Sequence, residues 1–343
     1  MAQHIYDTLV IGSGFSGLCM AVKLQEAGQT DFLILEKAAE EGGTWRENTY
    51  PGAACDVQSH LYSYSFAANP GWTHVFSPWH EILEYIQNTS RQYGIKQKIQ
   101  FNSEMQKADF DEATGIWTVT LKNGQSQQAH NLVLGTGPLH VPNIPNIPGL
   151  ENFKGEVFHS AKWNHDLNLS DKNVVSIGTG GSAIQYVPEL AKTAKKLTVF
   201  QRTAAWVLPR NERAYSSIEK WIFKHVPLVR KAYRSLLYWM NESRVLPMHK
   251  PSLIKVAQLG AKLHMRKQIK DKKIREQLTP DYTIGCKRIL ISNQYFPAFN
   301  RDNVDLNTDG IEEIRANSIV DKQGNEVPAD VIVMGTEIGR AHV

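Results

Sequence analysis

The chain has few cysteines, no long apolar run and little net charge, and each shortage excludes a class of protein. Cys19, Cys55 and Cys286 are the 3 cysteines in 343 residues, and they form no Cys-x-x-Cys pair. This disfavours a disulfide framework and a dithiol reductase and suits a reducing cytosol, so we expect a cytoplasmic protein. No apolar stretch approaches the roughly 18 residues of a membrane-spanning helix. The first residues also lack the pattern of a signal peptide, so we expect neither segment.

Charge and histidine spacing exclude further classes. A formal net charge of +4 is small for this length and gives no reason to expect nucleic acid as a partner. The 12 histidines include no His-Glu-x-x-His spacing, and no Gly-x-Ser-x-Gly elbow occurs. The sequence therefore argues against a metallohydrolase and a serine hydrolase and predicts no metal site. At 343 residues the chain is long enough for two domains or more.

A glycine-rich motif follows the first apolar run. Residues 6–11 read as a strand, and Gly12-Ser13-Gly14-Phe15-Ser16-Gly17 fits G-x-G-x-x-G at the start of a helical pattern. A second predicted strand, residues 32–35, ends at Glu36 and completes a βαβ unit. In this context Gly12, Gly14 and Gly17 let backbone N–H groups approach a pyrophosphate, and Glu36 accepts hydrogen bonds from ribose hydroxyls. The unit predicts a dinucleotide site.

The same arrangement occurs a second time. A strand at residues 173–177, the loop Gly178-Thr179-Gly180-Gly181-Ser182-Ala183, a helix to about residue 193 and a strand at 197–200 repeat the unit. Arg202 lies 24 residues after Gly178, as Glu36 lies 24 residues after Gly12. A guanidinium here pairs with a 2′-phosphate, so we expect NADPH in preference to NADH, although an ordinary surface role for Arg202 stays open. Two such sites predict hydride transfer from NADPH to a bound flavin.

Prolines and a change of pattern predict the domain limits. Pro142, Pro145 and Pro148 separate the two units, so we expect an FAD-binding domain in residues 1–145. The fold class is then α/β, with two Rossmann-like dinucleotide-binding domains, for FAD and NADPH. The second domain would consist of residues 146–211 and 281–337, with a helical insertion at 212–280. Strand-like character returns at residues 288–291 and 327–334, as if this domain resumed there.

The insertion is rich in basic residues. Between positions 212 and 276 there are 16 Lys or Arg against 5 Asp or Glu. We favour solvated helix faces over a patch that associates weakly with a membrane surface, because runs of charge usually face water.

Beyond these units, the sequence resembles the type I Baeyer-Villiger monooxygenases, a group of the class B flavoprotein monooxygenases. Phe153, Gly155, His159 and Trp163 match the fingerprint F-x-G-x-x-x-H-x-x-x-W, while Asn164 departs from the Pro or Asp that follows it in the family. The resemblance covers essentially the whole chain. It implies FAD and NADPH as cofactors, and O2 and a small-molecule ketone as substrates. One oxygen atom would be inserted next to the carbonyl, through an oxygen adduct at the flavin C4a, to give an ester or lactone. It also implies a structural or conformational role for His159.

The resemblance assigns further roles. The blocks Gly42-Gly43-Thr44-Trp45 and Tyr50-Pro51-Gly52-Ala53-Ala54-Cys55-Asp56 are similar to loops beside the flavin ring, and Gln201-Arg202-Thr203 to the segment that selects the nicotinamide cofactor. In Gly285-Cys286-Lys287-Arg288, the similarity implies that Arg288 lies over the flavin, that Lys287 helps to hold the 2′-phosphate, and that Asp56 orients Arg288. Arg288 and Asp56 are the expected catalytic residues, although residue type alone would make Asp56 a turn residue. A guanidinium keeps its proton near neutral pH and so stabilises an anionic peroxide without protonating it.

Two other functions stay open. One is an N- or S-oxygenating flavin monooxygenase, against which Arg288 and Trp163 argue. The other is a nucleotide-binding module without catalysis, which the end of the chain makes relevant. Gly335-Thr336-Glu337 stands where a final glycine is expected, and residues 338–343 resemble a translated sequencing adapter. Family members continue further, so we expect a C-terminally truncated chain with a non-native tail and an incomplete FAD-binding domain. The sequence predicts neither the ketone nor the oligomeric state.

Overall fold

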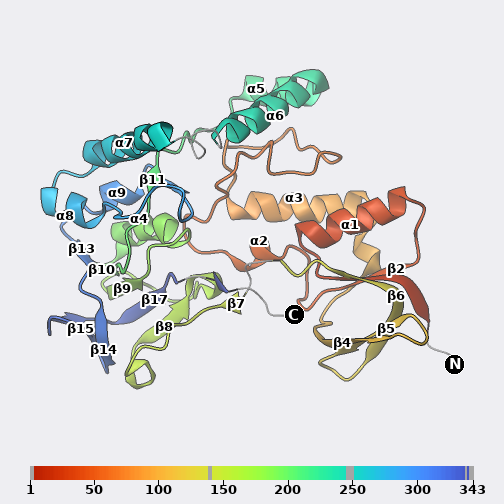
Figure 1. Ribbon diagram of the computed structural model, residues 1–343, viewed down its shortest axis with the longest axis horizontal. Helices are drawn as coiled ribbons and strands as arrows, with labels where there is room; N and C mark the ends of the chain where they lie inside the picture. The colour runs from red at the N-terminus through yellow and green to blue at the C-terminus, as the bar shows by residue number, and fades with distance from the viewer. Residues whose placement is uncertain (1–3, 138–140, 245–250, 337, 340–343) are drawn as a thin grey trace.

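The computed structural model describes residues 4–137, 141–244, 251–336 and 338–339. Two α/β units lie side by side along the longest axis, and the helices of the insertion lie above both (Figure 1). Of the expected non-native tail, Ile338–Gly339 form the short strand β18, which pairs antiparallel with β7 (Val141–Pro142). Glu337 and residues 340–343 lie outside the described residues.

The first unit contains a six-stranded sheet in the order β3-β2-β1-β6-β5-β4. The strands are β1 (Ile5–Ile11), β2 (Phe32–Leu35), β3 (Ile99–Gln100), β4 (Met105–Asp111), β5 (Ile116–Leu121) and β6 (Ser126–Leu134). The first four in this order run parallel, and β5 and β4 extend the sheet antiparallel. Val10 packs with residues of α1 (Phe15–Glu26) and α3 (Trp79–Gln92), whereas Leu9 packs with residues of β5. Both faces of β1 are therefore covered, as is typical of a parallel strand.

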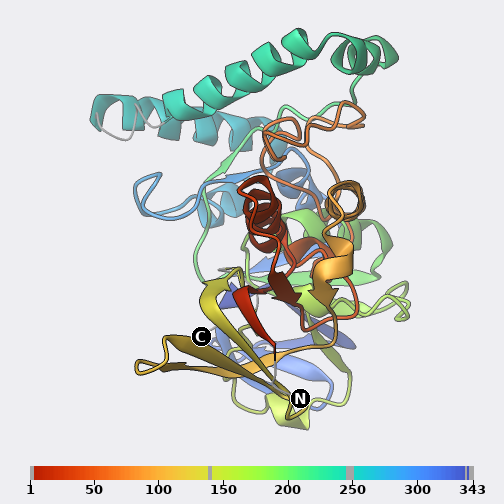
Figure 2. The same cartoon turned by 90° about the vertical axis from the view of Figure 1, so that its right-hand side faces the viewer.

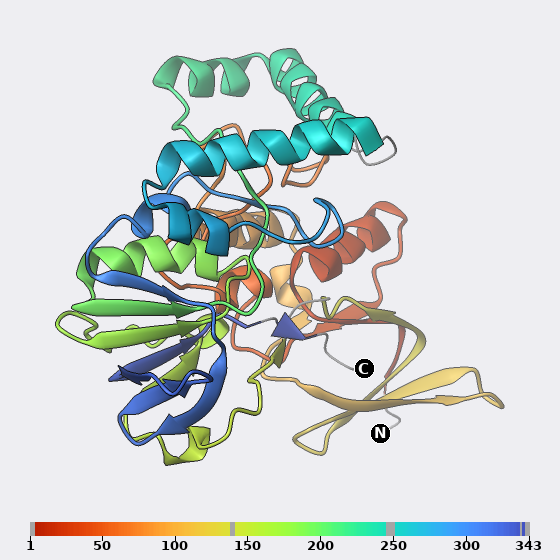
Figure 3. The ribbon, with the colours of Figure 1, turned by 60° about the vertical axis from the view of Figure 1, so that its left-hand side comes forward.

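The second unit contains a five-stranded, fully parallel sheet in the order β13-β10-β9-β17-β8. The strands are β8 (Glu156–His159), β9 (Asn173–Ile177), β10 (Lys196–Phe200), β13 (Val304–Asn307) and β17 (Val331–Met334). Two layers cover it (Figure 3). On one face lie α4 (Ala183–Thr193) and α9 (Tyr295–Ala298), and on the other the antiparallel strands β14 (Ile311–Arg315), β15 (Ser318–Asp321) and β16 (Glu326–Pro328). β9 lies between β10 and β17 as β1 lies between β2 and β6, so the central strands of the two units have the same arrangement.

The insertion begins and ends at a two-stranded parallel ribbon. Its strands are β11 (Val207–Leu208) and β12 (Leu290–Ile291), with Val207 opposite Leu290. Between them lie α5 (Ser217–His225), α6 (Pro227–Glu242), α7 (Pro251–Gln268) and α8 (Lys272–Gln277). The strand expected at residues 288–291 thus exists as β12, but it pairs outside the five-stranded sheet. The short elements α2 (Thr44–Glu47), η1 (Lys96–Lys98), η2 (Leu150–Asn152) and η3 (Ser160–Lys162) complete the chain's described helices.

The helix α6 lies on the side of the molecule farthest from the sheets (Figure 2), and it exposes an apolar stripe. Its inner face packs through Tyr233 and Leu237 on the first unit and α5. On the outer face Leu228, Leu236 and Trp239 are 76%, 55% and 68% exposed. These positions follow the helical spacing that usually marks a buried face. Among the described residues, the structure contains no helix with the length and apolar character needed to cross a membrane.

The fold is the one expected, but the expected domain limits at residues 145, 211, 280 and 337 stay predictions. The first sheet ends at Leu134, and the second begins at Glu156. The chain between these strands forms the short strand β7 and the short helix η2, which belong to neither sheet.

Candidate functional site

The first glycine-rich loop makes a tight turn between β1 and α1. Gly12 has a φ of +96°, and a Cβ atom on Gly17 would lie 1.8 Å from the carbonyl oxygen of Gly12. Only glycine fits these positions without a shift of the backbone. The N-cap of α1 is Gly14, and no side chain caps the helix. The first N–H groups of α1 therefore remain available as donors, which is the arrangement that binds a pyrophosphate.

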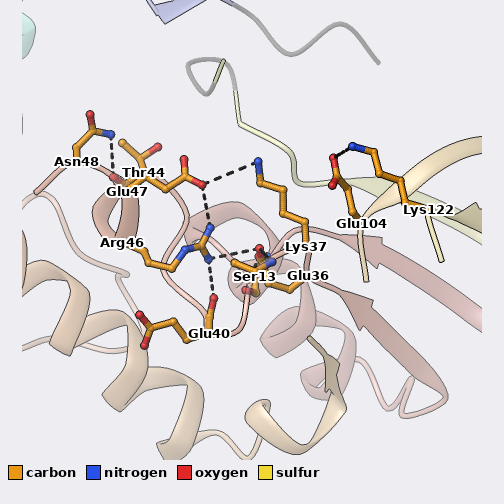
Figure 4. Close-up of polar contacts among 11 residues, drawn as sticks. Ser13, Glu36, Lys37, Glu40, Thr44, Arg46, Glu47, Asn48, Glu104 and Lys122 are labelled. Atoms are coloured by element: carbon orange, nitrogen blue, oxygen red, sulfur yellow. Dashed lines mark hydrogen bonds and ion pairs between the residues drawn. The ribbon is translucent and has the colours of Figure 1, made fainter. Parts of the chain in front are cut away.

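Glu36, directly after β2, lies against this loop (Figure 4). The residue is 4% exposed, and its Oε2 accepts hydrogen bonds from the backbone nitrogen of Ser13 at 2.8 Å and from its Oγ at 2.7 Å. Its Oε1 accepts from the backbone nitrogen of Ala38 at 3.0 Å and lies 3.4 Å from Nη1 of Arg46. The carboxylate thus joins the loop to the end of β2. An ionised carboxylate only accepts hydrogen bonds, which suits ribose hydroxyls as partners.

A second segment closes over the same loop. A Cβ atom on Gly43 would lie 3.1 Å from Cα of Gly14. Thr44 begins α2, and Trp45 is buried with its Nε1 donating to the hydroxyl of Tyr62 at 3.1 Å. The structure therefore places the segment expected beside a flavin on the first glycine-rich loop.

The second glycine-rich loop begins with the same tight turn as the first. Gly178 has a φ of +104°, and a Cβ atom on it would lie 2.6 Å from the carbonyl oxygen of Gly335. A Cβ atom on Gly12 would likewise lie 2.8 Å from the carbonyl oxygen of Gly135. Gly135 follows β6 and Gly335 follows β17, the two equivalent strands of their sheets. The first glycine of each loop thus packs closely against the glycine that directly follows the neighbouring strand.

The N-terminus of α4 also lacks a side-chain cap. Ser182 is the N-cap but makes no capping hydrogen bond, and Ala183 begins the helix in a fully buried position. A Cβ atom on Gly180 would be only in ordinary contact, 3.6 Å from the carbonyl oxygen of Gly335. The loop therefore has room for a ligand and free N–H groups to bind it.

Arg202 and Thr203 follow β10 beside this loop. The carbonyl oxygen of Thr203 accepts a hydrogen bond from Oγ1 of Thr179 at 3.2 Å, which ties the segment to the loop. Arg202 is exposed and has no hydrogen bond or ion pair with any residue the structure describes. Its five N–H donors are free to bind a ligand.

Asp56 and Arg288 come together although 232 residues separate them. Nη2 of Arg288 donates a hydrogen bond to Oδ2 of Asp56 within an ion pair, and the two side chains are 61% and 39% exposed. Part of the guanidinium therefore remains open to a ligand. Nζ of the adjacent Lys287 lies 4.8 Å from the centre of the Tyr282 ring. The expected catalytic pair is in contact, and its role is a proposal.

The fingerprint residues hold the edge strand β8 in place. A Cβ atom on Gly155 would lie 2.2 Å from the carbonyl oxygen of Asp330, so the strand approaches the sheet more closely than a side chain permits. Phe153 packs on the face covered by β14 and β15. Trp163 packs on the opposite face against Phe158 and Tyr186, with ring centres 5.1 and 5.5 Å apart. The fingerprint thus contacts both layers of the second unit.

His159 is bound through both ring nitrogens. Its Nδ1 accepts from the backbone nitrogen of Ala161 at 3.1 Å, so the proton is on Nε2, which donates to the carbonyl oxygen of Thr336 at 3.2 Å. Burial lowers the pKa of His159 below its ordinary value. Both nitrogens of the ring are thus engaged by the backbone, and neither is left free for a substrate. His159 instead joins the end of β8 to the segment after β17.

One contact between the two units depends on Gln185, which no sequence motif marks. On α4, Oε1 of Gln185 accepts from the hydroxyl of Tyr50 at 2.9 Å, and Nε2 donates to the carbonyl oxygen of Ala54 at 2.9 Å. Tyr50 and Ala53 are buried in the core of the second unit. A glutamine on a helix surface is unremarkable in sequence, so only the folded chain reveals this link.

Comparison with known proteins identifies the family. The model of a family described as flavin-binding monooxygenase-like matches residues 7–289. The chain therefore belongs to the flavin-binding monooxygenase-like family, and the family inferred from sequence is confirmed.

Known relatives extend this result. A Baeyer-Villiger monooxygenase of Pseudomonas aeruginosa is 47% identical over 336 residues, which cover 98% of this chain and 64% of the relative. A Baeyer-Villiger monooxygenase of Streptomyces coelicolor is 45% identical over 342 residues, which cover 98% of this chain and 66% of the relative. The chain thus spans about two thirds of the length of these curated relatives. A solved structure of OTEMO in complex with FAD and NADP is 27% identical with a TM-score of 0.86, covering 97% of this chain and 71% of that one. The expected fold class is confirmed.

Proposed function

We propose that this chain forms the FAD- and NADPH-binding part of a monooxygenase that inserts one oxygen atom from O2 next to a ketone carbonyl, giving an ester or lactone. The observation that carries the proposal is the contact between Asp56 and Arg288 in a chain with two unlike dinucleotide loops. The names of the relatives and the FAD and NADP in the OTEMO structure support it. The division into domains at residues 145, 211, 280 and 337 belongs to the same proposal.

The first loop would hold FAD. Gly12, Gly14 and Gly17 leave space for the pyrophosphate, and Glu36 offers its carboxylate to the ribose. Gly43, Thr44 and Trp45 lie beside the loop, where the flavin end would extend. FAD, once reduced by NADPH, supplies the electrons that activate O2.

The second loop would hold NADPH. Gly178, Gly180, Ser182 and Ala183 form its pyrophosphate cradle at the N-terminus of α4. Arg202, with Lys287 and Thr203, would bind the 2′-phosphate. A free guanidinium matches a phosphate in geometry and charge, so the extra phosphate of NADPH gains a partner that NADH lacks.

Arg288 would place a permanent positive charge at the reacting oxygen. A guanidinium can stabilise negative charge on the oxygen that attacks the carbonyl without protonating it. Asp56 occupies one side of the guanidinium and fixes its orientation.

The three cysteines are free thiols, which supports the proposal of a reducing, cytoplasmic location.

The test replaces Arg288 in the flavin-loaded protein. We expect Arg288→Ala to keep flavin reduction by NADPH within about threefold and to lower ester formation by about a hundredfold, the size typical for loss of one charge-stabilising group. Flavin bleaching in stopped-flow mixing and product analysis with a panel of cyclic ketones measure the two steps. Arg315→Ala, an exposed arginine paired with Glu313, is the matched control. A normal ester yield from Arg288→Ala would remove Arg288 from the reaction.

The same assay separates the other functions. Oxidation of sulfides or amines without any ester would indicate a heteroatom oxygenase. A flavin that NADPH never bleaches would indicate a nucleotide-binding module without catalysis.

A further inference from the structure

A buried arginine that no motif marks lies behind the Asp56–Arg288 pair. The side chain of Arg210 is 9% exposed, and its guanidinium carbon lies 4.7 Å from the centre of the Phe76 ring. Its Nη2 donates a hydrogen bond to the carbonyl oxygen of Cys55 at 3.2 Å. Cys55 directly precedes Asp56, so this bond fixes the backbone one residue away from the carboxylate that contacts Arg288.

The charge of Arg210 is only partly balanced. Burial lowers the pKa of Arg210 from its ordinary value. The nearest carboxylate oxygen is Oε2 of Glu212, which lies 3.4 Å from Nε of Arg210. The geometry between these two atoms is not that of a hydrogen bond. A buried guanidinium destabilises a fold unless its contacts compensate for lost hydration. The aromatic ring of Phe76 and the Cys55 carbonyl provide such contacts, and both belong to the first unit.

The backbone of Arg210 is bound to the segment that carries Arg288. The backbone nitrogen of Arg210 donates to Oδ1 of Asn293 at 3.0 Å, and Nδ2 of Asn293 donates back to the carbonyl oxygen of Arg210. Next to this pair, the β11–β12 ribbon adds hydrogen bonds from Leu290 to Trp206 at 2.9 Å and from Ser292 to Leu208 at 3.0 Å. The segments 206–210 and 288–293 are therefore fixed to each other.

These contacts form a closed ring. It runs from Asp56 to Arg288, along β12 to Asn293, across to Arg210, and through the Arg210 side chain to Cys55 and back to Asp56. We propose that Arg210 is a positioning residue that sets the geometry of the Asp56–Arg288 pair, its side chain holding one partner and its backbone the other. The proposal rests on the proposed function for its catalytic consequence. A catalytic pair requires such support from residues outside it to keep a productive geometry.

The first test needs neither flavin nor turnover. Cys55 is buried and belongs to the ring, Cys286 is exposed two residues before Arg288, and Cys19 is half-buried on α1 and takes no part in the ring. We expect Arg210→Gln to raise the labelling rate of Cys55 by a thiol reagent about tenfold or more, because loss of the bond frees its backbone. Cys19 should change by less than about twofold in the same sample. Peptide mass spectrometry reads each cysteine separately.

The second test uses the flavin-loaded protein. Arg210→Gln should lower kcat for ester formation about tenfold or more, because small displacements of catalytic groups have large effects on rate. The KM for NADPH should change by less than about twofold, since Arg210 contacts neither glycine-rich loop. In an Asp56→Asn background the added Arg210→Gln change should lower kcat by less than about twofold further, because the pair it positions is already lost.

Controls and a second variant keep the outcomes distinct. Arg213→Gln removes an exposed arginine three positions away that pairs with Glu219, and it should leave both readouts unchanged. If Arg210→Gln does not fold, Asn293→Ala tests the same ring from its other side, with the same expected results.

Unchanged Cys55 labelling, unchanged kcat, or equal losses of kcat with and without Asp56 would each overturn the proposal. If the unmodified protein forms no ester with any ketone, the proposed function fails, and the labelling result alone decides whether the ring exists.

Discussion

The loops at Gly12 and Gly178 share the backbone of their first turn, but the residue 24 positions after each has opposite surroundings. Glu36 is 4% exposed and already accepts hydrogen bonds from Ser13 and Ala38. Arg202 is exposed and unbonded within the described part of the chain. The shared backbone suits the pyrophosphate common to all dinucleotides. The two residues therefore differ in the structure: Glu36 is held by hydrogen bonds from its own loop, whereas the side chain of Arg202 has no such bond among the described residues.

The largest expected effect comes from the third position of each loop, glycine in the first and alanine in the second. In Gly17→Ala the new Cβ would lie 1.8 Å from a backbone oxygen, which no side-chain rotation relieves. We expect the free energy of unfolding to fall by about 3 kcal/mol or more. The counterpart Ala183→Gly should lower it by about 1 kcal/mol. Urea denaturation followed by far-UV circular dichroism measures both, and equal losses would show that the two loops do not differ in packing.

A smaller effect is expected from Glu36 and Arg202, which we propose as the residues that bind the two riboses. Arg202→Ala should raise the KM for NADPH about thirtyfold and that for NADH less than about threefold, because a charge-assisted contact to phosphate contributes about 2 kcal/mol. Glu36→Gln is the control in the other loop and should leave the NADPH to NADH ratio unchanged. Steady-state kinetics with both cofactors measure the ratio. An equal rise for the two cofactors in Arg202→Ala would show that Arg202 does not bind the 2′-phosphate.

The smallest effect is on the pH dependence of stability, in which the buried histidines of the two units, His60 and His159, should differ. His159 is bonded at both nitrogens, whereas Nε2 of His60 has no partner among the described residues. Burial, with the charges of Arg230 and Arg234, lowers the pKa of His60 to about 4. The unfolded chain therefore binds a proton at His60 more tightly than the folded chain does. The free energy of unfolding is highest above the ordinary pKa of 6.5 and decreases as the pH falls toward 4.

Between pH 7 and pH 5.5 the expected loss from His60 is about 1 kcal/mol. His60→Phe keeps an aromatic ring against Phe223 and removes the titration, so its urea midpoint should depend less on pH. The same slope in both proteins would assign the pH dependence to other groups.

The sequence predicted those parts of the fold that local pattern determines. The strands β2 and β9 have the bounds expected from their short apolar runs, since charge or glycine marks where each ends. The helix α1 begins at Phe15, inside the glycine-rich motif, because the loop already adopts helical geometry there. A strand was expected at residues 288–291, but its partner β11 was not, because that pairing depends on where the insertion leaves the unit.

The candidate site likewise contains residues that the sequence predicted and residues that it did not. Asp56 and Arg288 were named from family resemblance, and the structure brings them into contact. Arg210, Asn293 and Gln185 were missed because their hydrogen bonds join segments that only the folded chain brings together. Their residue types are common on surfaces, so nothing in a single sequence distinguishes them.

The apolar stripe of α6 has a practical consequence for all stability measurements proposed above. Leu228 and Trp239 face water in the folded chain, and dyes that fluoresce on apolar surfaces will bind there before any heating. A dye-based melting curve would therefore start from a bright baseline and would understate cooperative loss of structure. Circular dichroism, which reports the backbone, avoids this false signal.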